Sequence, residues 1–196
     1  MITFGVTGTR GQCTFALASA MQVIRDFGGV PAGTLLGKKW NENRFKAPYL
    51  RHGLWEKGYA VDTLETCSDW SRVPRMVQNV EAALKQGLQD ENETVHVFTH
   101  LSHVYAQGSS SYTTYVFRCA DTYEGTLARW RKLKNAASQA IVDNVGTISH
   151  QHGVGADHAP WLPAEKGPMG MAAIRSLCQH FDPAQVMNPG KLLEDE

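Results

Sequence analysis

The sequence lacks a surplus of charge of either sign. Its 196 residues include 19 lysines and arginines against 19 aspartates and glutamates. Proteins that bind nucleic acid use a basic surface to meet the phosphates, so this balance argues against a nucleic-acid partner. The chain also lacks an apolar run near the roughly 20 residues of a membrane span. Its start, MITFGVTG, has neither the charged nor the apolar region of a signal peptide. We therefore expect a cytoplasmic protein.

Two common cofactor-binding patterns are missing as well. The four cysteines lie far apart and never form a C-x-x-C pair, so their spacing fits no zinc ribbon and implies no disulfide framework. GTRGQ, at residues 8–12, is not a P-loop, and no G-x-G-x-x-G motif opens a helix after a strand. Nothing in this sequence pattern could hold a dinucleotide by itself.

The chain does contain a clear succession of strand and helix patterns. Alternating and β-branched stretches predict strands at residues 1–8, 59–70, 94–105, 111–120 and 147–150. Apolar residues at helical spacing predict helices at residues 14–27, 41–58, 71–88, 122–146 and 167–181. Ser71 is a plausible N-cap with Pro74 in the first turn of its helix, and the turn at 106–110 predicts an antiparallel hairpin.

This order of elements predicts an α+β fold. Helices would pack on one face of an antiparallel sheet, and the later elements follow the ferredoxin-like order of strands and helices. No repeat or low-complexity linker interrupts the chain. We therefore predict one compact domain over residues 1–196.

Histidines are the most prominent candidates for chemistry. Three of the eight lie in TISHQHGVGADH, residues 147–158, beside two glycines that free the backbone. His150 and His152 are two residues apart and would point to the same side of an extended segment. His100 and His103 would lie on opposite faces of their strand unless it bulges. A metal site, an acid–base site and a polar turn without chemistry all remain open for His150 and His152.

Tyr105 and Arg51 are two further candidates with open alternatives. Tyr105 ends a strand before a glycine turn, where a tyrosine is usually a packing residue but can also transfer a proton. Arg51 lies among apolar neighbours in APYLRHGL. It would form an ion pair with a residue such as Glu65, or bind a carboxylate or phosphate.

Five blocks of sequence resemble one known family. These are RFKAPYLRHGL, DTLETCSDWSRV, HLSHVYAQGSSSYTTYVF, GTISHQHGVGADHAPWL and FDPAQVMNPGKLL, which together span residues 44–193. In this order they resemble the C-terminal substrate domain of FAD-linked oxidases of the vanillyl-alcohol oxidase superfamily. TLET…W and SHVYxxG resemble more narrowly the alkyldihydroxyacetonephosphate synthases and their bacterial homologues. Residues 2–12 resemble the first strand of the domain.

The resemblance implies roles for three candidates. Tyr105 matches the tyrosine proposed for proton transfer in the synthases. His150 and His152 match the first and third members of the synthases' histidine triplet, and His152 also matches the catalytic histidine of the 2-hydroxyacid dehydrogenases. We expect these three side chains and Arg51 to line one cleft.

The resemblance also implies binding residues. Arg51 matches an arginine that contacts the acidic or phosphorylated group of a small substrate. Gln151, a substrate-binding position, departs from the family, which has histidine in the synthases and glutamate in the dehydrogenases. Asn188, in the C-terminal block, implies a cofactor contact. Metal-using dehydrogenases need that glutamate and two histidines seven residues apart. Gln107 stands seven residues after His100, so we expect no metal.

The resemblance implies FAD as cofactor, held mainly by an N-terminal domain that supplies the glycine-rich loop, in cis or in trans. The expected reaction is synthase-like, an exchange of acyl for alkyl on a dihydroxyacetone phosphate-type substrate. We expect the isolated chain to be inactive in this reaction. The alternatives are a 2-hydroxyacid oxidase or dehydrogenase domain and a non-catalytic module that binds a small anion. An exposed apolar surface rimmed by Trp161 and Met187 would favour a homodimer.

Overall fold

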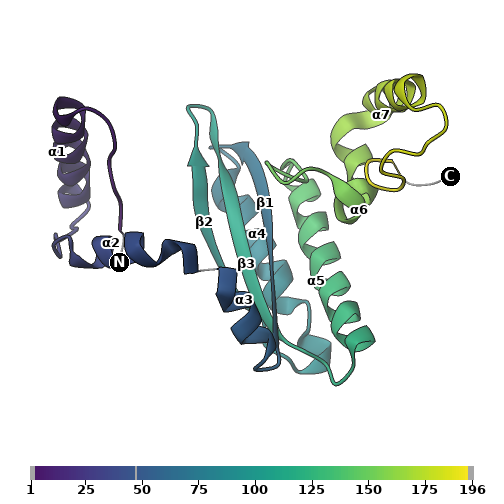
Figure 1. Cartoon of the computed structure of the whole chain (residues 1–196), viewed down its shortest axis with the longest axis horizontal. Coiled ribbons are helices and arrows are strands. Elements are labelled where there is room, and N and C mark those ends of the chain that lie inside the picture. The colour runs from purple at the N-terminus through teal and green to yellow at the C-terminus, as the bar shows by residue number, and fades with distance from the viewer. Residues whose placement is uncertain (1–2, 47, 194–196) are drawn as a thin grey trace. The chain divides into compact units, whose positions relative to one another are not determined.

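The computed structural model describes residues 3–46 and 48–193, and its contacts divide the chain after His52 into two compact units. Figure 1 shows their elements in order along the chain. The first unit is helical. Its elements are α1 (Arg10–Asp26), α2 (Leu35–Asn43), a 3-10 turn (Arg44–Lys46) and the start of α3 (Pro48–Trp55). The helix expected at residues 14–27 is therefore confirmed. The helical segment expected at 41–58 is confirmed in part, because it is divided among the end of α2, the 3-10 turn and α3.

The prediction of a strand at residues 1–8 is wrong for the described residues of this segment. Residues 3–7 form no regular structure, and residues 1 and 2 lie outside the described residues. A strand needs a neighbour to pair its backbone groups, and the described part of this unit holds no second strand. The helix that follows ends as expected, because Gly28 adopts a φ of 77° that stops it.

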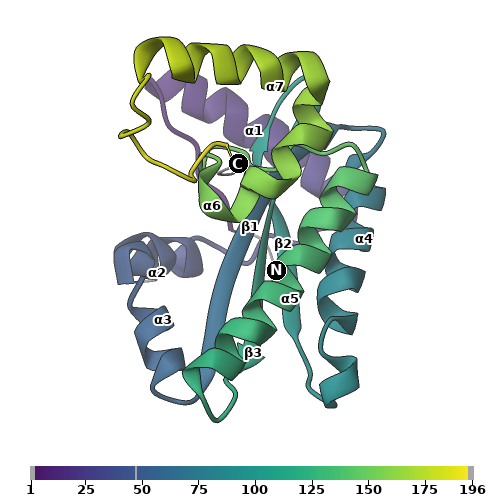
Figure 2. The same ribbon diagram turned by 90° about the vertical axis from the view of Figure 1, so that its right-hand side faces the viewer.

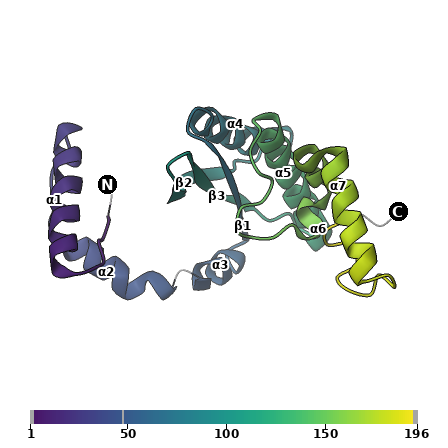
Figure 3. The same cartoon turned by 90° about the horizontal axis from the view of Figure 1, so that it is seen from above.

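The second unit is built on one antiparallel sheet. The sheet contains β1 (Tyr59–Asp69), β2 (His96–Val104) and β3 (Gly108–Arg118), in the order β1-β3-β2. Two helices, α4 (Val73–Gln86) and α5 (Tyr123–Asp143), lie on the same face of the sheet (Figures 2 and 3). A short 3-10 turn (Gln89–Glu91) precedes β2. The α+β fold with helices on one face is confirmed.

The alternation of side chains along the strands separates a core face from a polar face. Leu64 and Thr66 of β1, and Tyr115 and Phe117 of β3, are buried on the helix side with Met76 and Leu84 of α4 and Leu133 of α5. The residues between them, among them Glu65 and Tyr112, point to the opposite face because successive side chains of a strand alternate. The polar face therefore carries the candidate site, while the helix-covered face supplies the core.

Two helix starts differ from the sequence expectation. Arg72, and not Ser71, precedes the first residue of α4, because its N–H closes a turn on the Asp69 carbonyl at 2.8 Å. Pro74 does lie in the first turn. The last helix, α7 (Leu162–Phe181), begins before the expected Gly167, but Gly167 (φ 66°) and Pro168 kink it there. The segment after the kink is the helix that the sequence predicts.

The expected strand at 147–150 is also wrong, although the segment lies against β1. It forms no continuous ladder of hydrogen bonds with β1. The Thr147 N–H does donate to the Cys67 carbonyl, and the His150 N–H donates to the Glu65 carbonyl, each at 3.0 Å. The chain occupies the free edge of β1, where a ferredoxin-like fold has its fourth strand. It then passes through α6 (Gly155–His158) and a 3-10 turn (Ala159–Trp161).

None of the described helices combines the length and the apolar composition that crossing a membrane would require.

Candidate functional site

A buried glutamate lies at the centre of the polar face. Glu65 pairs across the sheet with Tyr112, and its side chain is only 4% exposed. The Ser102 hydroxyl donates a short hydrogen bond to Glu65 Oε1, and the hydroxyls of Ser102 and Ser110 lie 2.7 Å apart. A buried carboxylate is costly unless such groups satisfy it. The two serines thus hold a charged group on the polar face of the sheet.

A β-bulge brings His103 to the same carboxylate. The register of β2 against β3 shifts between Leu101 and Val104, which indicates a bulge. Without a bulge, the sequence pattern would place His103 on the opposite face from His100. His103 Nδ1 lies 3.6 Å from Glu65 Oε1, and its backbone N–H donates to Ser110 Oγ. His100 pairs with Tyr112 and stacks on its ring. The bulge therefore places both histidines on the polar face.

The histidine turn adds two further imidazoles. His150 Nδ1 lies 3.4 Å from Glu65 Oε1, and His152 Nε2 lies 3.1 Å from Glu65 Oε2. The backbone turns between and after them through left-handed conformations, with φ 62° at Gln151 and 73° at Gly153. Glycine adopts this conformation without strain, whereas glutamine rarely does. The sharp turn lets both histidines face one carboxylate.

The turn is held at its entry by a second carboxylate. Glu165 of α7 accepts hydrogen bonds from the Thr147 hydroxyl at 3.0 Å and from the Ile148 N–H at 2.9 Å. Burial opposes ionisation of Glu165, but these bonds and Lys166 outweigh it and hold its pKa below the usual range. Together with the two bonds to β1, this contact positions the histidines relative to the sheet.

Tyr105 completes the cluster from the hairpin. Its hydroxyl lies 3.2 Å from His150 Nε2, and the two rings meet edge to face. The Tyr105 N–H donates to the Gly108 carbonyl at 2.8 Å, and the Trp70 indole N–H donates to the Tyr105 carbonyl at 3.1 Å. The residue is 42% exposed. A fixed backbone and an exposed ring are suited to a group that meets a ligand.

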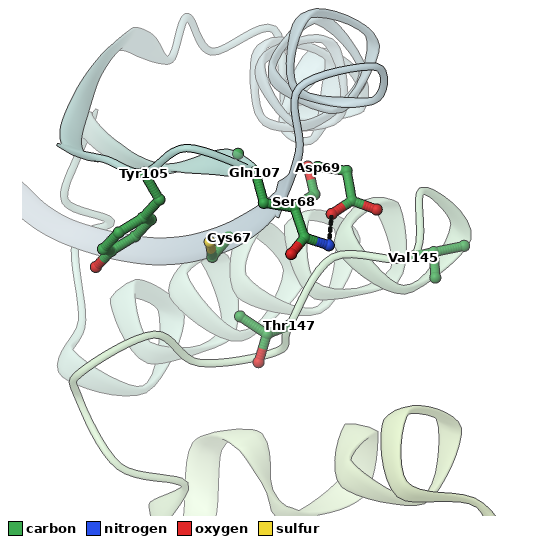
Figure 4. Close-up of a pocket in the computed structure, with 8 residues that line it drawn as sticks. Cys67, Ser68, Asp69, Tyr105, Gln107, Val145 and Thr147 are labelled. Carbon is green, nitrogen blue, oxygen red and sulfur yellow. Dashed lines mark hydrogen bonds between the residues drawn. The ribbon is translucent and has the colours of Figure 1, made fainter.

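Tyr105 also forms one wall of an open cavity of about 460 Å³. Cys67, Asp69, Gln107 and Thr147 contribute to its lining, and the Gln107 amide donates to Asp69 Oδ1 at 2.9 Å (Figure 4). The Tyr105 hydroxyl points away from this pair (Figure 4). Burial, Asp69 and Glu65 raise the pKa of the Cys67 thiol, so it is not a ready nucleophile. The volume is in the range of small-molecule sites.

The ionisation of Glu65 couples the site to the stability of the fold. Burial raises its pKa, but the neighbouring polar groups of Ser102, Ser110 and His150 outweigh burial and hold the pKa below the usual 4.5. A carboxyl with a lowered folded-state pKa contributes stability above its unfolded pKa, and this contribution is lost as the pH falls through the folded value.

We therefore expect the free energy of unfolding of this chain to fall as the pH drops below about 4.5. Glu65→Gln should flatten this dependence, because glutamine does not titrate. Denaturant unfolding measured between about pH 6 and pH 3 tests this. Parallel pH profiles for the two proteins would show that Glu65 carries no such linkage.

Three of the clustered groups have the chemistry of metal ligands. One ligand atom each of Glu65, His103 and His150 lies within 4.8 Å of the other two. One carboxylate and two imidazoles match a set that catalytic zinc accepts. The sequence argument against a metal rests on Gln107 and Gln151, neither of which belongs to this set. The expectation of no metal stays a prediction.

The structure brings together some of the expected site residues. Tyr105, His150 and His152 lie in one cluster. Arg51 belongs to the first unit and is exposed on α3. That it lines the same cleft as the other three side chains stays a prediction. The exposed side chains of Gln151 and Asn188 keep their substrate and cofactor roles as predictions. Both have left-handed backbone conformations.

The two residues expected to rim an apolar dimer surface differ in their exposure. Trp161 packs against the core, whereas Met187 is exposed. The homodimer stays a prediction.

Sequence reasoning missed Glu65 as the centre of the site. It considered this residue only as an ion-pair partner for Arg51. The available signal was a carboxylate in the middle of the β-branched strand DTLETC, where burial demands partners.

Comparisons with known proteins show what this chain is similar to. The family model "FAD linked oxidases, C-terminal domain" matches residues 1–192. Alkyldihydroxyacetonephosphate synthase of Trypanosoma brucei brucei is 27% identical over 193 residues, which is 98% of this chain and 31% of the relative. A probable mitochondrial D-lactate dehydrogenase of Danio rerio is 24% identical over 88% of this chain and 33% of the relative.

A solved structure of alkyldihydroxyacetonephosphate synthase has the same fold. It superposes with a TM-score of 0.60 at 19% identity, over 90% of this chain and 29% of the solved one. The chain therefore spans about a third of the length of the relatives that it matches.

Proposed function

The chain belongs to the family of FAD-linked oxidase C-terminal domains, and on this premise we propose that it is the substrate-side part of a flavoenzyme whose FAD is held mainly by another domain. Three observations support this. The relatives are about three times longer than this chain. The sequence has no glycine-rich pyrophosphate loop. The polar face of the sheet gathers tyrosine, histidine and carboxylate groups, which suit a substrate rather than a dinucleotide phosphate.

The proposed reaction is that of an alkyldihydroxyacetonephosphate synthase, in which an acyl group on a dihydroxyacetone phosphate-type substrate is exchanged for an alkyl group. The flavin would supply covalent or hydride chemistry, as cofactors generally supply the hard step of a reaction. This chain would bind the substrate and handle its protons. Tyr105, His150 and His152 are the proton-handling groups, and Arg51 and Gln151 bind the acidic part of the substrate. Asn188 contacts the cofactor.

One observation carries this proposal. Tyr105 comes from the hairpin and the two histidines from the turn after α5, yet all three meet around one buried carboxylate of β1. Tyr105 and His150 are 45 residues apart in sequence, and such distant side chains need a reason to share one cluster. A polar turn without chemistry would not require the ionised Glu65 beneath it, because burying a carboxylate is costly.

A second candidate function is oxidation of a 2-hydroxyacid. The similarity to the probable D-lactate dehydrogenase supports it. In that reaction His152 would take the hydroxyl proton of the substrate. Its imidazole is accessible, with 36% of the side chain exposed. The third alternative, a non-catalytic module for a small anion, would use the same cavity without turnover.

Two assays on the flavoenzyme that contains this chain separate these functions. The first follows incorporation of a labelled fatty alcohol into an acyl dihydroxyacetone phosphate substrate. The second follows reduction of a dye by D-lactate. Exchange without dye reduction supports the synthase, and dye reduction without exchange supports the dehydrogenase. Activity in neither assay, with saturable binding of dihydroxyacetone phosphate, would favour the binding module.

We also expect this chain, purified alone, to carry no stoichiometric FAD. It has no strand followed by a glycine-rich loop and a helix, which is the unit that holds a pyrophosphate. The absorbance of the native protein between about 350 and 500 nm, compared with that of the released cofactor, tests this. A yellow protein with one flavin per chain would contradict the assignment of FAD to another domain.

A further inference from the structure

Three groups of the cluster form a line from the buried carboxylate to the exposed phenol. Glu65 Oε1 lies 3.4 Å from Nδ1 of His150, and Nε2 of the same ring lies 3.2 Å from the Tyr105 hydroxyl. Nδ1 is enclosed and makes no hydrogen bond within the described part of the chain. The carboxylate oxygen is the acceptor that it faces. Contacts of this length commonly tighten when a catalytic site binds its ligand.

The charge of Glu65 decides which nitrogen of His150 carries the proton. An ionised carboxylate only accepts hydrogen bonds, and Glu65 Oε1 already accepts one from the Ser102 hydroxyl. The nitrogen that faces it, Nδ1, must then be the protonated one. In the neutral ring Nε2 is left with a lone pair, and the Tyr105 hydroxyl is placed to donate to it.

We propose that Glu65 is a positioning residue that fixes His150 in its Nδ1–H tautomer and so makes Nε2 the proton acceptor for Tyr105. The inference rests on the proposed function only in taking Tyr105 as the group that meets the substrate. When the Tyr105 oxygen takes a proton from the substrate, its own proton passes to His150 Nε2. The imidazolium formed lies against the Glu65 carboxylate, which stays ionised. The proton returns by the same path.

The other groups around Glu65 support this role. Ser102 donates to Oε1, and Ser110 lies 2.7 Å from Ser102, so the carboxylate cannot rotate freely. His152 Nε2 faces the second oxygen at 3.1 Å. His103 Nδ1 also lies 3.6 Å from Oε1, and its ring centroid lies 6.0 Å from that of His150. Among these imidazoles His150 has the shortest contact to Tyr105, which makes it the ring of the relay.

The tautomer of His150 can be measured on this chain without any substrate. Nitrogen-15 NMR of the imidazole distinguishes a protonated from an unprotonated ring nitrogen. In the neutral ring we expect the Nδ1–H form to exceed the Nε2–H form by about tenfold or more, which is the effect of one hydrogen bond to a charged group. An Nε2–H tautomer in the unmodified protein would overturn the proposal.

Two substitutions of Glu65 separate positioning from packing. Glu65→Leu keeps the bulk but removes the acceptor, so the tautomer ratio should fall by about tenfold or more. Glu65→Gln should keep the Nδ1–H form, because Ser102 orients the amide oxygen at the Oε1 position. Glu81→Gln is the matched control, a partly buried carboxylate of α4 bonded to Lys85, and it should leave the ratio unchanged. An unchanged ratio in Glu65→Leu would overturn the proposal, and if that variant does not fold, the unmodified protein decides it.

Turnover of the flavoenzyme gives the second readout. Glu65→Leu should lower kcat on the order of 10²-fold with little change in KM, and Glu65→Gln should recover part of the loss. Equal kcat in Glu65→Leu and the unmodified enzyme would overturn the relay. A wild-type enzyme inactive with both acyl dihydroxyacetone phosphate and D-lactate would refute the proposed function instead, and the NMR result would still decide the tautomer.

Discussion

Tyr105→Phe, introduced into the flavoenzyme that contains this chain, is expected to lower kcat by roughly 10²–10⁴ while the fold is retained. The substitution removes only the hydroxyl that lies 3.2 Å from His150 Nε2. The ring stays, so its edge-to-face contact with His150 is preserved. Proton transfer by a positioned side chain contributes about this factor to enzymatic rates.

Steady-state kinetics and a thermal unfolding curve check this result together. Tyr123→Phe is the matched control, because Tyr123 is the exposed first residue of α5. It should change neither kcat nor the unfolding temperature. Full turnover in Tyr105→Phe would leave the cluster of side chains standing but would remove Tyr105 from the chemistry.

His152→Ala is the second substitution with a large expected effect, again a loss of kcat of roughly 10²–10⁴. Its Nε2 lies 3.1 Å from Glu65 Oε2, which orients the ring and leaves Nδ1 for a ligand. His152 is therefore the imidazole best placed to exchange a proton with the substrate itself, whereas His150 is enclosed between Glu65 and Tyr105.

The loss of a partner for a buried carboxylate could also destabilise the fold, so the control must separate the two effects. His152→Asn keeps a polar side chain near Glu65 without an imidazole, and it should restore stability but not kcat. His180→Ala should be nearly silent, because His180 lies in the last turn of α7, where its ring meets Phe181 edge to face. Full activity in His152→Asn at unchanged KM would show that His152 is structural.

Much of the fold could be predicted because its signals are local. The alternation in residues 59–70, the helical spacing in 71–88 and 122–146, and the small-residue turn of the hairpin each depend on neighbours along the chain. All became elements of the structure at nearly the expected places. Proline and glycine mark the kink of α7 for the same reason, since their effect on the backbone needs no distant partner.

The two strands that failed show the limit of local patterns. Residues 3–7 and 147–150 have strand-like sequences, yet neither forms a strand. A strand exists only when another segment pairs its backbone groups. The second segment finds two such bonds on β1 and then turns away at Gln151. No pattern within four or five residues contains that information.

The candidate site divides in the same way. The sequence alone determined the α+β class, most element positions and the identity of Tyr105, His150 and His152 as polar groups suited to chemistry. Only the tertiary structure decided that Glu65 lies beneath them and that a bulge turns His103 towards it. The physical reason is that their convergence depends on sheet register, the bulge and the left-handed turn at Gln151, which together bring distant segments within hydrogen-bond range.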